Sequence, residues 1–143
     1  MVVLDAAALI AVMKNEPAAN TVGDLLYGST VMSSVNYCEV IDHLLRIVRV
    51  DQDWIDLHLA PVIHTSLQVV APDAQLAEEA AQVRAVNYHS RDCPISLADS
   101  FSIATAISVD APLATSDPAI IGVLAEMDHH VIALPNSRGE FPQ

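Results

Sequence analysis

The segment VVLDAAALIAVM, residues 2–13, joins a short apolar run to an alanine-rich helical pattern through a single aspartate. Valine and leucine at 2–4 are typical of a strand that is buried on both faces. Aspartate directly after a strand is a common helix N-cap, and the residues after Asp5 have the composition of a short helix. We therefore predict a strand over 2–4, a helix after Asp5, and a carboxylate at their junction.

The same alternation continues along the chain. Apolar runs rich in β-branched residues predict strands at 2–4, 30–33, 67–70, 112–115 and 131–134. Helical patterns lie at 35–49, 54–64, 74–89 and 97–109, and we expect Pro61 to break the second, Asp73 to cap the third and a short helix to follow Asp117. Strands that alternate with helices predict an α/β fold, with a parallel sheet sandwiched between helices in three layers.

The length of 143 residues is that of one domain, which we assign to residues 1–143, with a loosely structured tail from about residue 135. Cys38 and Cys93 are far apart and form no metal-binding pattern, so we expect reduced thiols. No uncharged apolar segment approaches the roughly 18 residues of a membrane span. The opening MVVLD lacks the features of an export signal, so we expect a cytoplasmic protein with no membrane partner.

The charge balance is strongly acidic. Eighteen Asp and Glu residues against six Lys and Arg give a formal net charge of -12. This charge disfavours non-specific attraction to nucleic acids and anionic membranes, and it favours cationic partners or metal ions.

Four carboxylates are expected at one edge of the predicted sheet. Asp5 and Asp117 directly follow strands, and the carboxyl ends of parallel strands form the edge at which ligands bind. Glu39 lies about one turn into the helix after the strand at 30–33. Asp99 begins its helix, and that first turn can face the same edge.

Each acid also has a purely structural interpretation. Ser96 and Asp99 match a capping box, which on its own accounts for Asp99. Asp5 and Asp117 are each as consistent with an N-cap as with a functional carboxylate. For Glu39 the alternative is a solvated polar seam with Asp42, His43 and Arg46 at helical spacing. The opposite stripe of that helix, expected to be core, contains Cys38, Ile41, Leu45 and Val48.

Four segments together resemble a known family. VVLDAAALIAVMKNEP, VMSSVNYCEV, ISLADSFSIATA and PLATSDPAI are similar, in order and spacing, to the four acidic motifs of PIN-domain nucleases, and within them to VapC-type toxins. The resemblance implies that Asp5, Glu39, Asp99 and Asp117 form a catalytic quartet that binds Mg²⁺ or Mn²⁺, with Thr115 and Ser116 supporting the last acid. It also implies an endoribonuclease that cuts RNA such as tRNA or rRNA, a protein antitoxin and a homodimer.

The chemistry of the four acids agrees with that implication. Carboxylates are hard oxygen ligands that suit Mg²⁺ or Mn²⁺, and such ions can activate water and orient a phosphodiester. Cations are few, and we select Arg91, eight residues before Asp99, as the substrate-binding one. An acidic surface would also attract a cationic antitoxin segment, and an arginine placed among the acids could replace the metal.

Two alternatives remain open at the level of sequence. Family members often have Ser or Asn where this chain has Ala7, and often Arg where it has Ser100. These departures and the scarcity of cations leave room for a catalytically weak binding module on the same fold. The second alternative, a receiver-like phosphoacceptor domain, also gathers acids at strand ends but requires a late lysine, whereas the single lysine here is Lys14.

Overall fold

Five parallel strands form the centre of the computed structural model, which describes residues 1–142. The strands are β1 (Val2–Leu4), β2 (Thr30–Ser33), β3 (Leu67–Val70), β4 (Leu113–Thr115) and β5 (Val131–Ala133). Their order across the sheet is β3-β2-β1-β4-β5, and all neighbouring pairs are parallel. The predicted α/β class and the positions of all five strands are confirmed.

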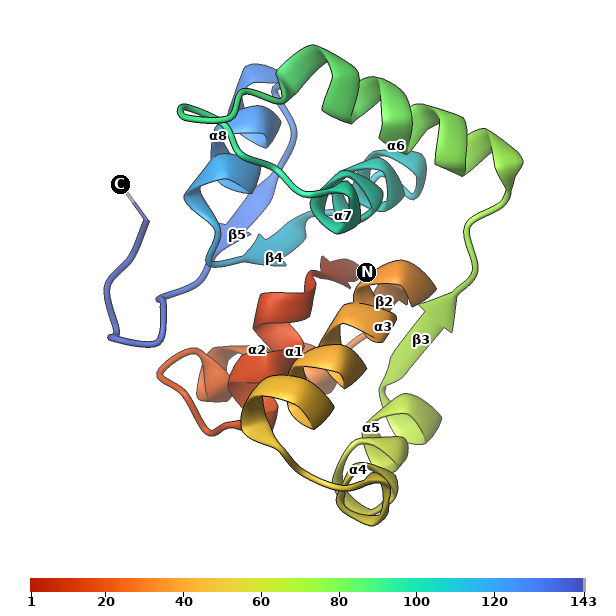
Figure 1. Cartoon of the computed structure of the whole chain (residues 1–143), viewed down its shortest axis with the longest axis vertical. Helices are drawn as coiled ribbons and strands as arrows, with labels where there is room; N and C mark the ends of the chain where they lie inside the picture. Colours follow the sequence, from red (N-terminus) through yellow and green to blue (C-terminus); the bar gives the residue numbers. More distant parts are fainter. Residues whose placement is uncertain (143) are drawn as a thin grey trace.

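Helices cover both faces of the sheet (Figure 1). One face carries α6 (Ala74–Asn87), α7 (Leu97–Ser108) and α8 (Pro118–Glu126). The other carries α1 (Ala6–Met13), α2 (Ala19–Leu26), α3 (Ser34–Asp42), its π-helical continuation η1 (His43–Val48), α4 (Gln52–His58) and α5 (Ala60–Thr65). This is the expected three-layer arrangement, with α2 as a helix that the sequence patterns did not predict. None of the described helices is both long enough and apolar enough to cross a membrane.

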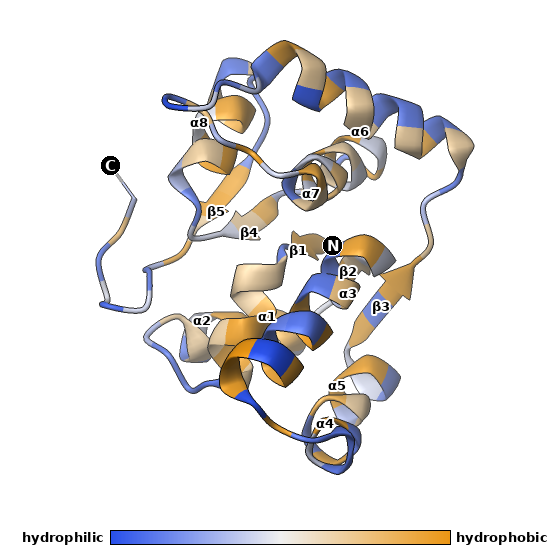
Figure 2. Ribbon diagram, in the orientation of Figure 1, coloured by the Kyte–Doolittle hydropathy of each residue, from blue (hydrophilic) through white to orange (hydrophobic). Residues whose placement is uncertain are grey.

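The two faces of the sheet have separate hydrophobic cores, because successive strand residues point to opposite faces. Leu4 joins the core beneath α1 and α3, whereas its neighbour Val3 joins the core beneath α7 and α8. Figure 2 shows largely apolar strands between helices that carry both apolar and polar residues. β1 pairs with β2 on one side and β4 on the other, which brings the carboxyl ends of three strands together.

The local signals for helix boundaries are confirmed. Asp5, Asp73 and Asp117 are the N-caps of α1, α6 and α8, each accepting a hydrogen bond from a backbone N–H in the first turn. The predicted break at Pro61 separates α4 from α5, where proline occupies the first turn and needs no backbone donor.

Most of the predicted buried stripe of the helix after β2 is wrong, and of its members only Ile41, which is partly buried, packs against the core. Cys38, Leu45 and Val48 are exposed, whereas Val40 and Leu44 are fully buried. The buried face also contains a polar residue, Asn36, at the same spacing of four. Because Asn36 is polar, the pattern of apolar residues did not include it. The predicted buried face is therefore rotated about the helix axis relative to the observed one.

Paired substitutions test this register. Leu44→Ala removes a fully buried side chain and should lower the free energy of unfolding by about 2–5 kcal/mol. Leu45→Ala removes the same atoms from a side chain that is 40% exposed, and its effect should be much smaller. Urea denaturation of both variants measures the difference. Equal losses, or a larger loss at Leu45, would contradict the observed orientation of the helix.

Candidate metal centre

Asp5 lies at the end of β1 and is 4% exposed. Its Oδ1 atom accepts a hydrogen bond from the backbone N–H of Ala8 at 2.9 Å, which caps α1. Its Oδ2 atom accepts a short hydrogen bond from the hydroxyl of Thr115, at the end of the neighbouring strand β4. The carboxylate is therefore held between two adjacent strand ends.

The Thr115 hydroxyl also fixes the start of the loop to Asp117. Thr115 is fully buried, and its Oγ1 atom accepts the backbone N–H of Asp117 at 3.0 Å. Asp117 in turn accepts the N–H of Ala119 at 2.7 Å and so caps α8. One hydroxyl thus links the first and fourth predicted acids.

Asp99 occupies the first turn of α7. The helix α7 connects to the parallel strand β4 and runs antiparallel to it, so the start of α7 lies at the carboxyl edge of the sheet. The predicted capping box is confirmed. Oδ2 of Asp99 accepts the N–H of Ser96 at 2.6 Å, and the Ser96 hydroxyl accepts the N–H of Asp99 at 3.0 Å. The cap uses one carboxylate oxygen and leaves Oδ1 for another ligand.

Glu39 is half-buried on α3 and does not belong to a solvated seam. Its pKa is raised, first by burial and then by the negative charges of Asp99, Asp42 and Asp117, while the Asn36 side chain lowers it. The other part of the expected seam, the ion pair between Asp42 and Arg46 at 3.0 Å, is present on the exposed face.

Asp5 has a strongly raised pKa. Burial is the main cause that raises it from 3.8 to about 7. The charges of Asp99 and Asp117 act in the same direction, whereas the hydrogen bonds from Thr115 and Ala8 oppose it. Because Asp99 and Asp117 raise the pKa of both Asp5 and Glu39, the four predicted acids lie near one another at one edge of the sheet.

The chemistry of this donor set fits a hard divalent cation. Carboxylate oxygens are the ligands that Mg²⁺ and Mn²⁺ prefer, and a cation would relieve the repulsion that raises the pKa values. In the observed rotamers Asp5, Asp99 and Asp117 are engaged in caps, and no three His, Cys, Asp or Glu side chains within residues 1–142 are grouped as ligands of one ion. Coordination of one ion would therefore require these side chains to turn toward one another.

A groove of about 380 Å³ opens beside Glu39. Ser116 and Ala7 line its near end, and Lys14 and His43 lie along it. Lys14 is paired with Glu16 at 2.5 Å, and the Nε2 atom of His43 is buried without a hydrogen-bond partner among the described residues. The groove continues to residues 135–137 of the C-terminal segment.

The predicted substrate cation occupies a different place. Arg91 is exposed in the loop between α6 and α7, and it is not among the residues that perturb Asp5 or Glu39. Lys14, which the sequence patterns did not single out, shares the groove with Glu39. The role of Arg91 stays a prediction.

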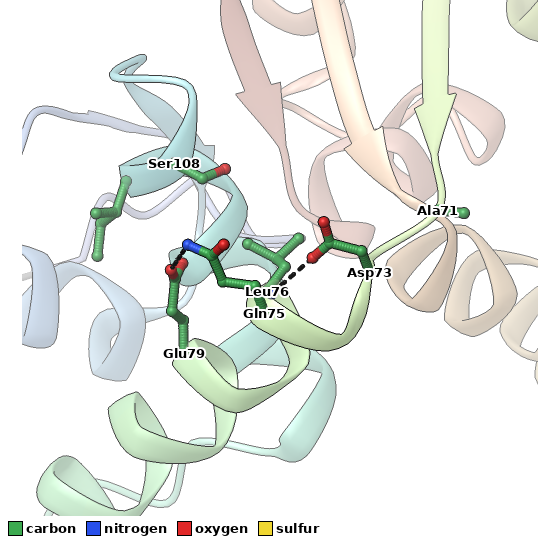
Figure 3. A pocket seen from close by; sticks show the side chains of 7 residues that line it. Ala71, Asp73, Gln75, Leu76, Glu79 and Ser108 are labelled. Atoms are coloured by element: carbon green, nitrogen blue, oxygen red, sulfur yellow. Dashed lines mark hydrogen bonds between the residues drawn. The ribbon is translucent and has the colours of Figure 1, made fainter.

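A second concavity, of about 480 Å³, lies between the start of α6 and the end of α7 (Figure 3). Its two acids are already engaged, because Asp73 caps α6 at Leu76 and Glu79 accepts a hydrogen bond from Gln75. None of the four predicted acids lines it. It is therefore separate from the candidate metal centre.

Asn36 is the site residue that sequence reasoning missed. It is 1% exposed on α3, and its Nδ2 atom donates to the carbonyl of Ala98 at 2.9 Å, directly before Asp99. The sequence feature that could have indicated it is an asparagine three residues before Glu39. It lies on the buried face of α3, which the pattern of apolar residues did not identify.

Comparison with known proteins supports the assignment of the fold. The family model of the PIN domain matches residues 2–125. No curated protein matches the sequence. VapC20 of Mycobacterium tuberculosis, described as a toxin that cleaves the sarcin–ricin loop, superposes with a TM-score of 0.67 at 18% identity over 85% of this chain and 94% of that one.

Two further solved structures are similar along nearly their whole length. A toxin–antitoxin complex from Klebsiella pneumoniae has a TM-score of 0.69 at 14% identity, covering 92% of this chain and 96% of that one. VapBC-1 from nontypeable Haemophilus influenzae has a TM-score of 0.64 at 22% identity, covering 92% and 97%. At these identities the likeness shows the fold.

The raised pKa of Asp5 predicts how stability depends on pH when metal is removed. Between pH 3.8 and about 7 the folded protein binds a proton at Asp5 that the unfolded chain does not. The contribution of Asp5 to stability therefore falls as pH rises through this window, by up to about 4 kcal/mol. Asp5→Asn keeps an oxygen for the Ala8 N–H, loses the acceptor for the Thr115 hydroxyl and cannot ionise, so it should remove this fall in stability between pH 5 and pH 8.

Urea denaturation in chelator at pH 5 and pH 8 measures both effects. Asp24→Asn, which removes an exposed carboxylate on α2, is the control and should leave the pH dependence unchanged. If Asp5→Asn lost as much stability between pH 5 and pH 8 as the wild type, the account of Asp5 as a buried, repelled carboxylate would be wrong.

Proposed function

Because this chain belongs to the PIN domain family, we propose that it is a metal-dependent endoribonuclease and the toxin of a toxin–antitoxin pair. The observation that carries the proposal is the buried Asp5, whose pKa is raised by burial and by two neighbouring acids at the same sheet edge. None of the ion pairs within residues 1–142 neutralises a member of the quartet. Such a cluster is suited to an external cation.

Asp5, Glu39, Asp99 and Asp117 would hold Mg²⁺ or Mn²⁺. The ion, when bound, supplies the charge that activates water and stabilises the leaving oxygen of a phosphodiester. The protein supplies placement: Thr115 fixes the rotamer of Asp5 and the approach of Asp117 through its two hydrogen bonds. Ser116, between them, lines the groove where a substrate strand would enter.

We assign the groove beside Glu39 to the RNA strand next to the scissile phosphate. Lys14 lines this groove, and its pairing with Glu16, whose side chain is 19% exposed, would be exchanged for a phosphate of that strand. Arg91, selected from the sequence, remains the alternative contact.

The partner we propose is a protein antitoxin. One structural neighbour is described as a toxin–antitoxin complex, and the net charge of -12 favours a cationic segment. A homodimer, a cytoplasmic location and an RNA target such as tRNA or rRNA belong to the same proposal.

A non-catalytic binding module is the second candidate. Ala7 lines the groove where relatives often have Ser or Asn, and the surface is acidic for an RNA enzyme. The receiver-like alternative is wrong, because that fold places β1 between β2 and β3, whereas β1 here lies between β2 and β4.

Cleavage of RNA separates the two candidates. With Mg²⁺ or Mn²⁺ the wild type should cleave a mixture of structured RNAs, and Asp5→Asn should lower the rate by about 100-fold or more, since it removes the most enclosed ligand. Asp24→Asn should cleave like wild type. Absence of metal-dependent cleavage by the wild type would favour the binding module.

Lys14 and Arg91 can be compared in the same assay. Lys14→Met keeps the apolar stem and removes the charge, so KM should rise with little change in kcat, and the slope of log KM against log salt should fall by about 1. Arg91→Met is the matched loss of one cation. If Arg91→Met raised KM and Lys14→Met did not, the strand would follow the loop before α7 instead of the groove.

A further inference from the structure

Asn36 joins two helices at the acid site. It lies in the first turn of α3 and is 1% exposed. Its side-chain Nδ2 atom donates to the backbone carbonyl of Ala98 at 2.9 Å, across 62 positions of sequence. Ala98 immediately precedes Asp99, so this bond ties α3 to the first turn of α7.

The same amide also contacts Glu39. The Asn36 side chain lies near the Glu39 carboxyl, one helical turn further along α3, and lowers its pKa, which favours the charged form. An NH₂ group has two hydrogens, and both acceptors can be served at once. Asn36 therefore connects the helix turn that presents Asp99 with the carboxyl of Glu39.

The side-chain oxygen of Asn36 indicates that this residue does more than fill space in the core. Oδ1 of Asn36 is buried and has no hydrogen-bond partner among the described residues. Leaving a buried acceptor unpaired costs about 1–3 kcal/mol, and most buried polar groups are satisfied. An apolar side chain of similar size would avoid that cost but would lose both contacts to the acid site.

We propose that Asn36 is a positioning residue that sets the separation of Glu39 and Asp99 and thereby raises the affinity of the site for a divalent cation. This inference rests on the proposed metal site. It assigns Asn36 no contact with the ion and no part in bond breaking. The competing explanation is that the amide only holds α3 against α7.

Affinity for Mn²⁺ distinguishes the two explanations. At pH 8, above the pKa of about 7 at Asp5, free Mn²⁺ can be followed by electron paramagnetic resonance during titration of the folded protein. Asn36→Leu removes both contacts and should raise the Kd by about 10–100-fold, the usual effect of losing a partner that orients a ligand. Asn36→Ser, whose side chain is too short to reach both partners, should also raise the Kd, at a smaller risk to folding.

Thr30→Val is the matched control. Thr30 is 2% exposed, and its hydroxyl donates to the carbonyl of Ser66 at 2.7 Å, so the variant also loses one buried bond between elements. Thr30 begins β2, at the opposite edge of the sheet from the acids. Its melting temperature should fall while its Mn²⁺ affinity stays at the wild-type value.

The outcomes separate this inference from the proposed function. Loss of affinity in both Asn36 variants and not in Thr30→Val supports the positioning role. Wild-type affinity in the Asn36 variants, or an equal loss in Thr30→Val, overturns it. A wild type that binds no Mn²⁺ overturns the metal site itself.

Discussion

The carboxylate of Asp5, buried at the end of β1 and bonded to the Thr115 hydroxyl, is the constraint on which the site depends. Because β1 and β4 are adjacent and parallel, this bond spans two strand ends and fixes the loop to Asp117 through the same hydroxyl. The remaining acids reach this edge because each lies at or near the start of a helix that begins there. The topology alone therefore concentrates negative charge at one place, and burial makes that charge costly.

The helix caps and the proposed metal ligands are largely the same side chains. Asp5, Asp99 and Asp117 each accept a backbone N–H at a helix start, and helix N-termini are favourable places for negative charge. Capping offsets part of the cost of gathering carboxylates in the folded protein. It also keeps each of them close to the position at which a cation would bind, so that structural and functional interpretations do not compete at these residues.

Much of this arrangement was predictable from the sequence, because its signals are local. The strand VVL, the cap at Asp5 and the capping box of Ser96 and Asp99 each depend on a few neighbouring residues, and the alternation of strands with helices leads to the parallel sheet. What was missed depends on contacts between distant segments. Asn36 meets Ala98 across 62 positions, and Lys14 shares a groove with the C-terminal segment, so neither leaves a local pattern. The π-helical turn after α3 also has no simple periodic signal.

The central claim is that one edge of this sheet is a divalent metal site. Anomalous diffraction from crystals of the protein grown with Mn²⁺ tests it most directly, because it locates the ion without reference to activity. The account predicts an anomalous peak between Asp5 and Asp99, with Glu39 or Asp117 turned toward it. Crystals containing Mn²⁺ in which this edge shows no peak and Asp5, Asp99 and Asp117 remain in their capping rotamers would contradict the claim.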